Sequence, residues 1–356
     1  ALALKGRVLL LWASPLFNRA NDMQRWTDAY ETMSKDLADI NACGYGLYNE
    51  NNNINGSAFA NMFLQSKQNP EAVFVTLYNN VQGDGLDNQK NNRWERDIRP
   101  ANTGGGGKNA SAMLVDMFPM ADGKIPASAG TYTKLEASSI TYESGFPFMN
   151  RDPRFYRTFA FPGFRWAYNG NASEKDKNNP SDGKNYVLWN YVWYKNSDDV
   201  ENVESGSSYA ADNLGNSKVG VYVRKKSDDA DVNGAPLYNY VANDTKGAAP
   251  FYSAAPLIEL RYAEVLLNFA EVACGAGHMD VAVDQLQKIR ARAGYTAENN
   301  YGLQTNLASD QAACMSAILY ERQIEFAYEG KRFDDLRRWM LFDGGAERVP
   351  GAPNSW

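Results

Sequence analysis

The C-terminal part of the chain carries two helical patterns that constrain the fold more than any other feature of the sequence. Over residues 257–274, polar side chains recur on one stripe of a helix and apolar side chains on the opposite stripe. Gly275 and Gly277 follow, as is typical of a helix end that needs a left-handed residue. Asp280 then caps a second helix with its own apolar period. The polar stripe comprises Arg261, Glu264, Asn268 and Glu271, and the apolar stripe comprises Tyr262, Leu266, Phe269 and Ala273.

These two helices predict a hairpin similar to a tetratricopeptide unit. Ala270 and Ala282 would be the small residues at which the helices cross. Residues 1–75 hold a second pair, in which the first helix ends near Pro15 and the next carries apolar residues at three- and four-residue steps from Trp26 onward. The sequence therefore predicts a mainly α fold with helix hairpins at both ends.

The middle of the chain lacks the helical periodicity of the two ends. Clusters of Gly, Asn, Asp and Ser mark loops, and short apolar runs between them predict strands at residues 73–77, 186–194 and 219–223. Irregular segments on a helical scaffold are where binding residues tend to lie. We therefore expect one compact fold with a helical scaffold at 1–75, a loop-rich ligand-binding region at 76–255 and a helical scaffold at 256–356.

Composition argues against several classes of function. A formal net charge of −6 and a pI near 5.1 disfavour nucleic acid and anionic membrane surfaces as partners. No uncharged apolar run reaches the roughly eighteen residues of a membrane-spanning helix. The single His278 disfavours zinc and Ser-His-Asp chemistry. Cys43, Cys274 and Cys314 have no disulfide or metal-ligand spacing, so we expect them to be small buried residues.

Aromatic residues make up 13% of the chain and direct attention to one class of ligand. Aromatic faces beside amides and carboxylates suit a polyhydroxylated ligand, although core packing would explain them too. Trp94 lies with Asn92 and Arg93 in a polar loop without a helical or strand period. Its indole therefore either folds back onto the scaffold or faces a ligand.

Two further aromatic groups are candidates for ligand contact. Trp166 and Tyr168 follow a Pro-Gly turn, and Trp189 and Trp193 share one face of the predicted strand at 186–194. A flat ring can stack on the CH face of a sugar, while nearby amides and charges bind its hydroxyl groups. Packing inside the protein is the alternative for both groups.

A calcium site is one interpretation of a short acidic segment. Asp229, Asp231 and Asn233 fit the first half of a D-x-D-x-N-G calcium loop. The twelfth position is Tyr240, where an EF-hand requires a bidentate Glu. An Asx-rich turn is the other interpretation, and no further cofactor is indicated.

Several sequence blocks resemble the RagB/SusD family of outer-membrane nutrient-binding lipoproteins. Residues 321–339 match the family pattern E-R-x-x-E-x-x-x-E-G-x-R-x-x-D-L-x-R-W. Because further blocks follow the family order over nearly the whole chain, the resemblance is specific. These blocks are residues 3–8, 13–17, 118–123, 150–155, 260–271 and 289–294.

The resemblance implies a SusD-like fold and a non-catalytic function. Such a protein captures oligosaccharides, or in some members peptides, at the cell surface and passes them to a SusC-like TonB-dependent transporter. The resemblance also implies an outer-membrane lipoprotein whose lipidated cysteine and first helices lie outside this sequence. Its C-terminal end is expected to be cut short at Trp356.

The block at 321–339 reads as scaffold and not as a catalytic site. Glu321 and Glu325 lie on one helix face, where a pair of catalytic carboxylates could be imagined. Neighbouring arginines would instead neutralise them in an ion-pair network between helices. The arginines expected to do so are Arg322, Arg332, Arg337 and Arg338. Arg151 and Arg154, beside an Asp-Pro turn, are expected to anchor their own loop.

Two other functions stay open at this stage. A glycoside hydrolase would share the aromatic surfaces, but it needs two carboxylates beside a cleft, one with a raised pKa. A helical-repeat adaptor would bind a protein partner on its concave helix faces.

Overall fold

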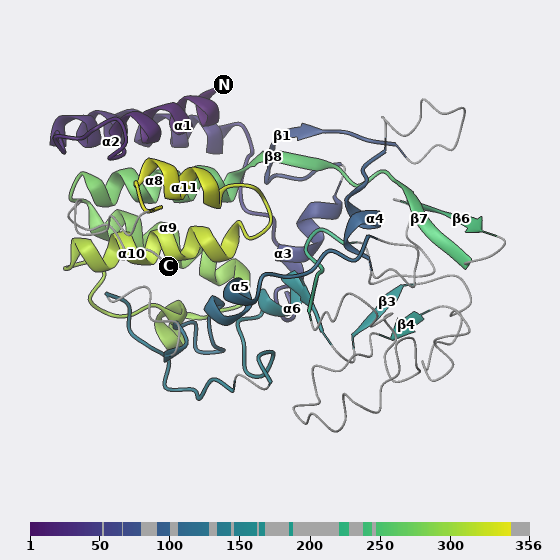
Figure 1. Cartoon of the computed structure of the whole chain (residues 1–356). Helices are drawn as coiled ribbons and strands as arrows, with labels where there is room; N and C mark the ends of the chain where they lie inside the picture. Colours follow the sequence, from purple (N-terminus) through teal and green to yellow (C-terminus); the bar gives the residue numbers. More distant parts are fainter. Residues whose placement is uncertain are drawn as a thin grey trace.

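Helices from the two ends of the chain stack against each other into one lobe (Figure 1). In this computed structural model, α1 and α2 pack on α8, and α8 packs on α9 and α10. The helices of the lobe are α1 (Leu2–Ala13), α2 (Met23–Ala42), α8 (Tyr262–Gly275), α9 (Met279–Ala293), α10 (Gln311–Glu325) and α11 (Arg332–Arg338). The structure describes residues 1–51, 53–65, 67–79, 91–99, 106–127, 134–143, 146–161, 164–167, 185–187, 221–227, 238–243 and 247–342.

The N-terminal hairpin forms as its sequence predicts. α1 ends at Ala13, two residues before Pro15, and the Asp22 carboxylate accepts a hydrogen bond from the Gln24 backbone amide at the start of α2. Trp26, which opens the predicted apolar face of α2, is buried. The helix hairpins expected at both ends of the chain are therefore confirmed, and together they form a single lobe.

The predicted helix over residues 257–274 is wrong at its start. Its first residues form strand β8 (Leu257–Arg261), which pairs antiparallel with β1 (Ala72–Thr76), and α8 begins only at Tyr262. Pairing with a segment far away in the sequence supplies the backbone hydrogen bonds that a helix would otherwise make. Asp280 lies in the first turn of α9, and His278 takes the N-cap position that we expected for Asp280.

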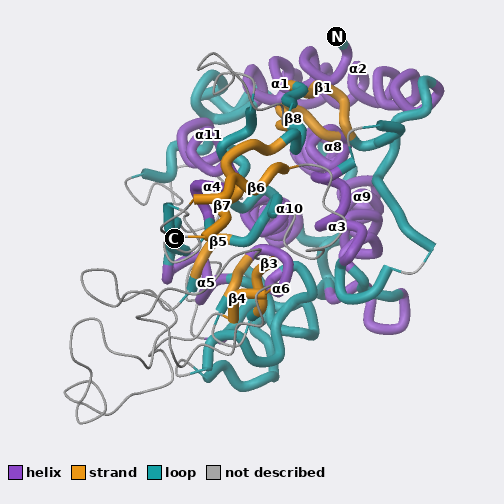
Figure 2. Tube along the Cα trace, turned by 90° about the vertical axis from the view of Figure 1, so that its right-hand side faces the viewer, coloured by secondary structure: helices purple, strands orange, loops and turns teal. Residues whose placement is uncertain are grey.

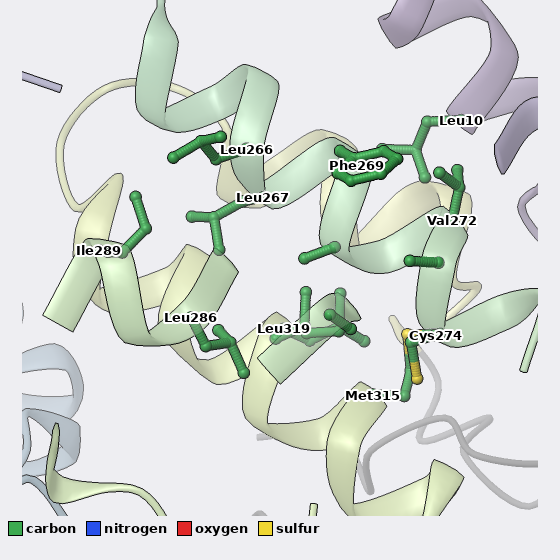
Figure 3. Close-up of a cluster of buried hydrophobic side chains, with 14 of the residues drawn as sticks. Leu10, Leu266, Leu267, Phe269, Val272, Cys274, Leu286, Ile289, Met315 and Leu319 are labelled. Carbon is green, nitrogen blue, oxygen red and sulfur yellow. The ribbon is translucent and has the colours of Figure 1, made fainter. Parts of the chain in front are cut away.

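The whole of α8 is buried, including its polar stripe. Ala270 and Ala282 are both fully buried in the same core cluster as Phe269 and Leu286, as a close helix crossing requires. Figure 3 shows apolar side chains of α8, α9 and α10 gathered between these helices. The core thus encloses α8, so its polar side chains must find partners inside the protein.

Two of the three cysteines are buried, as expected, and one is not. Cys274 in α8 and Cys314 in α10 are fully buried members of the main core cluster. Cys43 is exposed, so the prediction of burial is wrong there. It follows the last residue of α2, where the chain leaves the lobe.

The loop-rich region contributes short helices and pairs of strands. In the described residues the strands form four two-stranded antiparallel pairs, β1–β8, β2–β5, β3–β4 and β6–β7. In Figure 2 the strand pairs are arranged one after another along the molecule, from β1 and β8 near α1 to β3 and β4 at the other end. The short helices are α3 (Ser57–Asn61), η1 (Met62–Leu64), α4 (Trp94–Ile98), α5 (Ala112–Met117), α6 (Phe155–Thr158) and η7 (Ala297–Gly302). The remaining strands are β2 (Phe159–Ala160), β3 (Arg165–Ala167), β4 (Asn185–Val187), β5 (Tyr222–Val223), β6 (Tyr238–Asn243) and β7 (Gly247–Ser253).

The three predicted strands are found in part. β1 covers most of the strand predicted at 73–77, and β5 covers the end of the one predicted at 219–223. β4 covers only the first residues of the run at 186–194, whose remainder lies outside the described residues. β2, β3, β6, β7 and β8 were not predicted.

Phenylalanines fill a second core under the loop-rich region. Phe118, Phe155 and Phe159 are fully buried, and the Phe118 ring centroid lies 5.8 Å from that of Phe155 and 5.0 Å from that of Phe159. Edge-on contacts of this kind stabilise a core beyond the area that they bury. Part of the high aromatic content is thus explained by packing.

None of the described helices is both long and apolar enough to span a membrane.

We predict that Gly275→Ala destabilises the helical lobe. A Cβ atom at this position would lie 2.4 Å from Cε3 of Trp26, so the helix or the indole must shift. We expect the free energy of unfolding to fall by about 1–3 kcal/mol, measured by urea denaturation. Gly46→Ala is the matched control, because an added Cβ meets no heavy atom within 4 Å there. Equal losses in the two variants would contradict the prediction.

Candidate functional site

The segment expected to be a polar loop around Trp94 contains the short helix α4 (Trp94–Ile98). The Asn92 side-chain oxygen accepts a hydrogen bond from the Trp94 backbone amide at 2.9 Å, and the Asp97 amide donates to the Arg93 carbonyl at 3.0 Å. The expectation of a loop is therefore wrong. A single helical turn is too short to show an apolar period in the sequence.

The Trp94 indole is partly buried and has defined partners. Its Nε1 donates to the Lys225 backbone carbonyl at 2.7 Å. The ring packs, with Phe164, against a small apolar cluster. The ammonium groups of Lys108 and Lys226 lie 4.7 Å and 5.3 Å from the ring centroid, within cation–π distance. The cluster consists of Ile98, Ala160, Tyr222 and Val223.

The two residues before Trp94 have different surroundings. The Asn92 amide nitrogen donates to the Ala255 carbonyl at 2.8 Å, and its backbone amide donates to the Ser253 carbonyl. Asn92 therefore ties α4 to the end of β7. Arg93, the residue before Trp94 in the chain, is exposed.

Several predicted site residues cannot be compared with this geometry. The backbone of Trp166 lies in β3, opposite Tyr186 of β4. The Trp166 side chain, together with Tyr168, Trp189, Trp193, Asp229, Asp231 and Asn233, lies outside the described part of the chain. Within the described ranges, no group of three or more His, Cys, Asp or Glu side chains could hold a metal ion.

A run of three basic residues after β5 reaches the rings of Phe164 and Trp94 and was not singled out from the sequence. Arg224 lies over the ring of Phe164 at 4.4 Å, and Lys226 lies beside Trp94. Lys225, between them, is buried and points into the protein. Three consecutive cations directly after the strand predicted at 219–223 are a signal that could have drawn attention to this turn.

Beneath this surface lies a network of buried ion pairs centred on Glu325. Its carboxylate accepts hydrogen bonds from Arg154 at 2.9 Å, from Arg261 at 2.7 Å and from Arg292. All four side chains are buried. Because a buried charge is costly unless it is paired, these contacts must form together for the fold to be stable.

The same network joins segments from every region of the chain. Among the described residues its carboxylates are Glu71, Asp152, Glu321, Glu325 and Glu329, and its cations are Arg154, Lys225, Arg261, Arg290 and Arg292. The Tyr295 hydroxyl adds a hydrogen bond of 2.9 Å to Asp152. Five negative groups thus face five positive groups, which we name the central network.

Lys225 connects the central network to the Trp94 surface. Its Nζ donates to the Glu325 carbonyl at 2.7 Å and to the Glu329 carboxylate at 2.6 Å, while its backbone carbonyl accepts the bond from Trp94. Burial lowers the pKa of Lys225 to about 7, and the nearby Glu329 charge offsets this only in part.

A second buried network ties α11 to α8. Arg338 pairs with Glu271 and, at 2.8 Å, with Asp335. Arg322 donates to Asp335 at 3.0 Å and to the Asn268 side chain at 2.6 Å. The polar stripe of α8 therefore serves to fix α10 and α11 inside the lobe.

The structural interpretation of Glu321 and Glu325 is confirmed, although we predicted the wrong arginines as their partners. Arg322 and Arg338 bind Asp335 and Glu271, and the predicted roles of Arg332 and Arg337 find no support in the ion pairs of the described residues. The glutamates are neutralised by Arg154, Arg261, Arg290 and Arg292, from more distant blocks. These arginines lie far from the glutamates in the sequence, so a local pattern could not indicate them as partners.

Arg151 and Arg154 anchor their loop as expected. Arg151 donates to the carbonyls of Val115, Phe118 and Pro147. Arg154 pairs with Asp152 at 2.9 Å and with the central network. The loop before α6 is thus fixed from both sides.

The pKa shifts of buried carboxylates are opposite to those of a general acid. Burial alone would raise the pKa of Glu329 and of Asp335, but neighbouring cations outweigh it and lower each to about 2. The pKa values of Asp152 and Glu325 are lowered by the arginines around them in the same way. A glycosidase acid needs a raised pKa, so these groups stabilise the fold instead.

We predict that Glu325→Gln destabilises the protein by about 3–5 kcal/mol, the cost of removing one partner from a buried ionic cluster. Chemical denaturation measures the loss. The control is Asp284→Asn, which breaks a pair with Lys288 whose side chains are about half exposed. That control should change stability by less than about 0.5 kcal/mol. A small change for Glu325→Gln would show that the network carries little stability.

We also predict a loss of stability in acid. The pKa of Glu329 and of Asp335 is about 2 in the folded protein, below the ordinary value of about 4.5 or 3.8 in the unfolded chain. Their contribution is therefore complete above about pH 4.5 and is lost as the pH falls toward 2. Each group contributes on the order of 2–4 kcal/mol to the free energy of unfolding. Unfolding free energies measured from pH 6 to pH 2 should decline over this window, and a flat profile would contradict the assignment.

The family model of the SusD family matches residues 70–355. Among solved structures, the chain is similar to a SusD-like protein from Bacteroides fragilis, with 24% identity and a TM-score of 0.60 over 97% of this chain and 54% of that one. A SusD-like carbohydrate binding protein from the same organism gives 18% identity and a TM-score of 0.55 over 98% of this chain and 52% of that one.

A SusD superfamily protein from Bacteroides vulgatus gives 16% identity and a TM-score of 0.52 over 99% of this chain and 54% of that one. The chain spans about half the length of these solved structures. No curated protein matches it. These likenesses show a common fold, and the family match covers both the loop-rich region and the C-terminal helices. The chain belongs to the SusD family.

Proposed function

We propose that this chain binds oligosaccharide nutrients at the cell surface and breaks no bond in them. The observation that carries the proposal is the match to the SusD family over residues 70–355, a span that includes the Trp94 surface and the basic turn after β5. A solved relative of the same fold is described as a carbohydrate binding protein, which favours a glycan as the ligand here.

The Trp94 surface has the chemistry that glycan binding requires. The ammonium groups of Lys108 and Lys226 lie near the partly buried indole of Trp94, and the exposed Arg93 precedes it in the chain. An aromatic ring offers a face for a sugar ring, and the cations offer donors to hydroxyl oxygens. The Lys225 carbonyl holds the indole Nε1 and the Asn92 side chain holds the Trp94 backbone amide, so the surface is prepared before ligand arrives. Trp166, Tyr168, Trp189 and Trp193 are proposed as further ligand contacts.

Uptake would require a partner in the membrane. We propose delivery to a SusC-like TonB-dependent outer-membrane transporter, with the chain held at the outer membrane by a lipid anchor. Calcium at Asp229, Asp231 and Asn233 is a further proposal, tested by the effect of a chelator on the unfolding midpoint.

Three alternatives predict different observations. A peptide-binding member of the same family would bind peptides and ignore glycans. A glycoside hydrolase would release new reducing ends, whereas the carboxylates of Glu321 and Glu325 are held by arginines. An adaptor would bind its partner through the helical lobe and not through the Trp94 surface.

An array of glycans and peptides, followed by calorimetry and a reducing-end assay, tests the proposal. We expect a glycan ligand and no new reducing ends after prolonged incubation. Binding to peptides alone, or release of sugar ends, would overturn it.

We predict that Trp94→Ala weakens glycan binding by about tenfold or more, as truncation of an aromatic contact does. Because the indole also packs on the cluster and bonds to Lys225, this variant should lose about 2 kcal/mol of stability. Trp94→Phe keeps the ring and should recover most of the binding.

Trp12→Ala is the matched control for both measurements. Trp12 is 39% exposed on α1, in the helical lobe, so its loss should leave glycan affinity unchanged. Binding is compared at a temperature where circular dichroism shows every variant folded. Equal affinities for wild type and Trp94→Ala would remove Trp94 from the site.

A further inference from the structure

Two cysteines meet where α8 ends and α10 begins. Cys274 is the last residue but one of α8, and Cys314 lies in the first turn of α10. Both side chains are fully buried in the main core cluster, and both are thiols in this structure. They lie about 40 residues apart in the sequence, so it is the fold that brings them together.

The Cys274 thiol has two partners on α10. It donates a weak hydrogen bond to the Gln311 carbonyl, whose oxygen lies 3.6 Å from the sulfur, and it is also hydrogen-bonded to the Cys314 thiol. The main core cluster contains residues from every helix of the lobe, yet its two cysteines are in contact with each other. A chance distribution of two thiols through such a core would rarely pair them.

Hydrogen bonds also hold the two helix ends in register. The Gln311 side-chain nitrogen donates to the Cys274 carbonyl at 2.7 Å and to the Gly275 carbonyl at 3.3 Å. Asp310 caps α10 by accepting a bond of 3.0 Å from the Ala313 amide. A disulfide requires two backbone positions that are held close together. These bonds fix the backbone beside both cysteines and so keep the two sulfur atoms within reach of each other.

The folded protein protects this pair of thiols from reaction. The hydrogen bond with Cys314 and burial in the core raise the pKa of Cys274, so the folded protein holds little of the thiolate that attacks a disulfide. Any bond between the two sulfurs must therefore form during folding, before α8 and α10 close over them. Cys43 is exposed and does not belong to the cluster.

We propose that Cys274 and Cys314 form a disulfide bond when the chain folds in the presence of an oxidised thiol compound. One cysteine thiolate attacks the disulfide of the oxidant and releases one reduced thiol, which leaves a mixed disulfide. The other cysteine thiolate attacks this mixed disulfide, releases the second reduced thiol and closes the bond within the protein. The cysteines lose two protons and two electrons in total, and the oxidant takes them up as two thiols.

The bond would join two helices of the lobe covalently and enclose α9 between them. It closes a loop of about 40 residues, which lowers the entropy of the unfolded chain and so favours the folded one. Disulfides persist in proteins exposed at the cell surface. Only this setting rests on the proposed function, because the bond itself does not depend on glycan binding.

Production of the full chain in two redox environments tests the proposal. One preparation is exported to an oxidising bacterial periplasm and the other is made in a reducing cytoplasm, and thiols are counted in denaturant without reductant. We expect one free thiol, that of Cys43, in the exported chain and three in the cytoplasmic chain. Mass spectrometry of the exported chain should show a peptide of Cys274 linked to one of Cys314.

Three free thiols in the exported chain would overturn the proposal, and so would a bond from Cys43 to either buried cysteine. Cys43→Ser is the matched variant, because it removes the exposed thiol and leaves the buried pair intact. Its exported form should contain no free thiol. Two free thiols in that variant would show that the contact between Cys274 and Cys314 is packing alone.

The unfolding midpoint shows what the bond does for the lobe. We expect the exported chain to unfold about 5 °C above the same chain treated with a reductant. Cys314→Ala cannot form the bond, so reductant should leave its midpoint unchanged, and an equal shift in this variant would contradict the assignment. If Cys314→Ala does not fold, the peptide map of the wild-type chain decides. A failure here would leave the proposed glycan binding untouched, since no ligand enters these measurements.

Discussion

Buried ion pairs between five carboxylates and five cations hold the loop-rich region against the helical lobe. The arginines come from the loop before α6, from β8 and from α9, and the carboxylates come mainly from α10 and the turn after it. The loop-rich half has only short strand pairs in its described residues, so backbone ladders cannot hold it in place. An apolar cluster that joins Phe118, Phe155 and Phe159 to Tyr320 and Ile324 of α10 provides part of the attachment. Charge pairing provides another part, and its desolvation cost means that its contacts must form together.

The candidate site depends on the same attachment. Lys225 contributes its ammonium group to the central network and its carbonyl to Trp94. The indole is therefore placed by a residue that itself cannot move unless the network opens. A surface built in this way has a fixed shape despite its irregular backbone, which is how loops can bind ligands without losing much entropy.

The sequence predicted the helices well because their apolar period is local. Trp26 and its successors in α2, and the two stripes of α8, are visible within a few turns. β8 was missed because its pairing with β1 depends on residues far away in the chain. The spacing of Glu321 and Glu325 correctly placed them on one face, but spacing alone could not tell which arginines reach that face. The role of Trp94 in ligand binding stays a prediction, and its hydrogen bond to Lys225 could not be predicted because it depends on tertiary structure.

The three consecutive cations after β5 have a short and fixed spacing. Arg224 and Lys226 are two residues apart, so their Cα atoms cannot be separated by more than about 7 Å. Lys225 is held between them by its bonds to Glu325 and Glu329. Because Arg224 contacts the ring of Phe164 and Lys226 contacts the ring of Trp94, the positions of these two rings are coupled to each other through a residue that is anchored inside the protein.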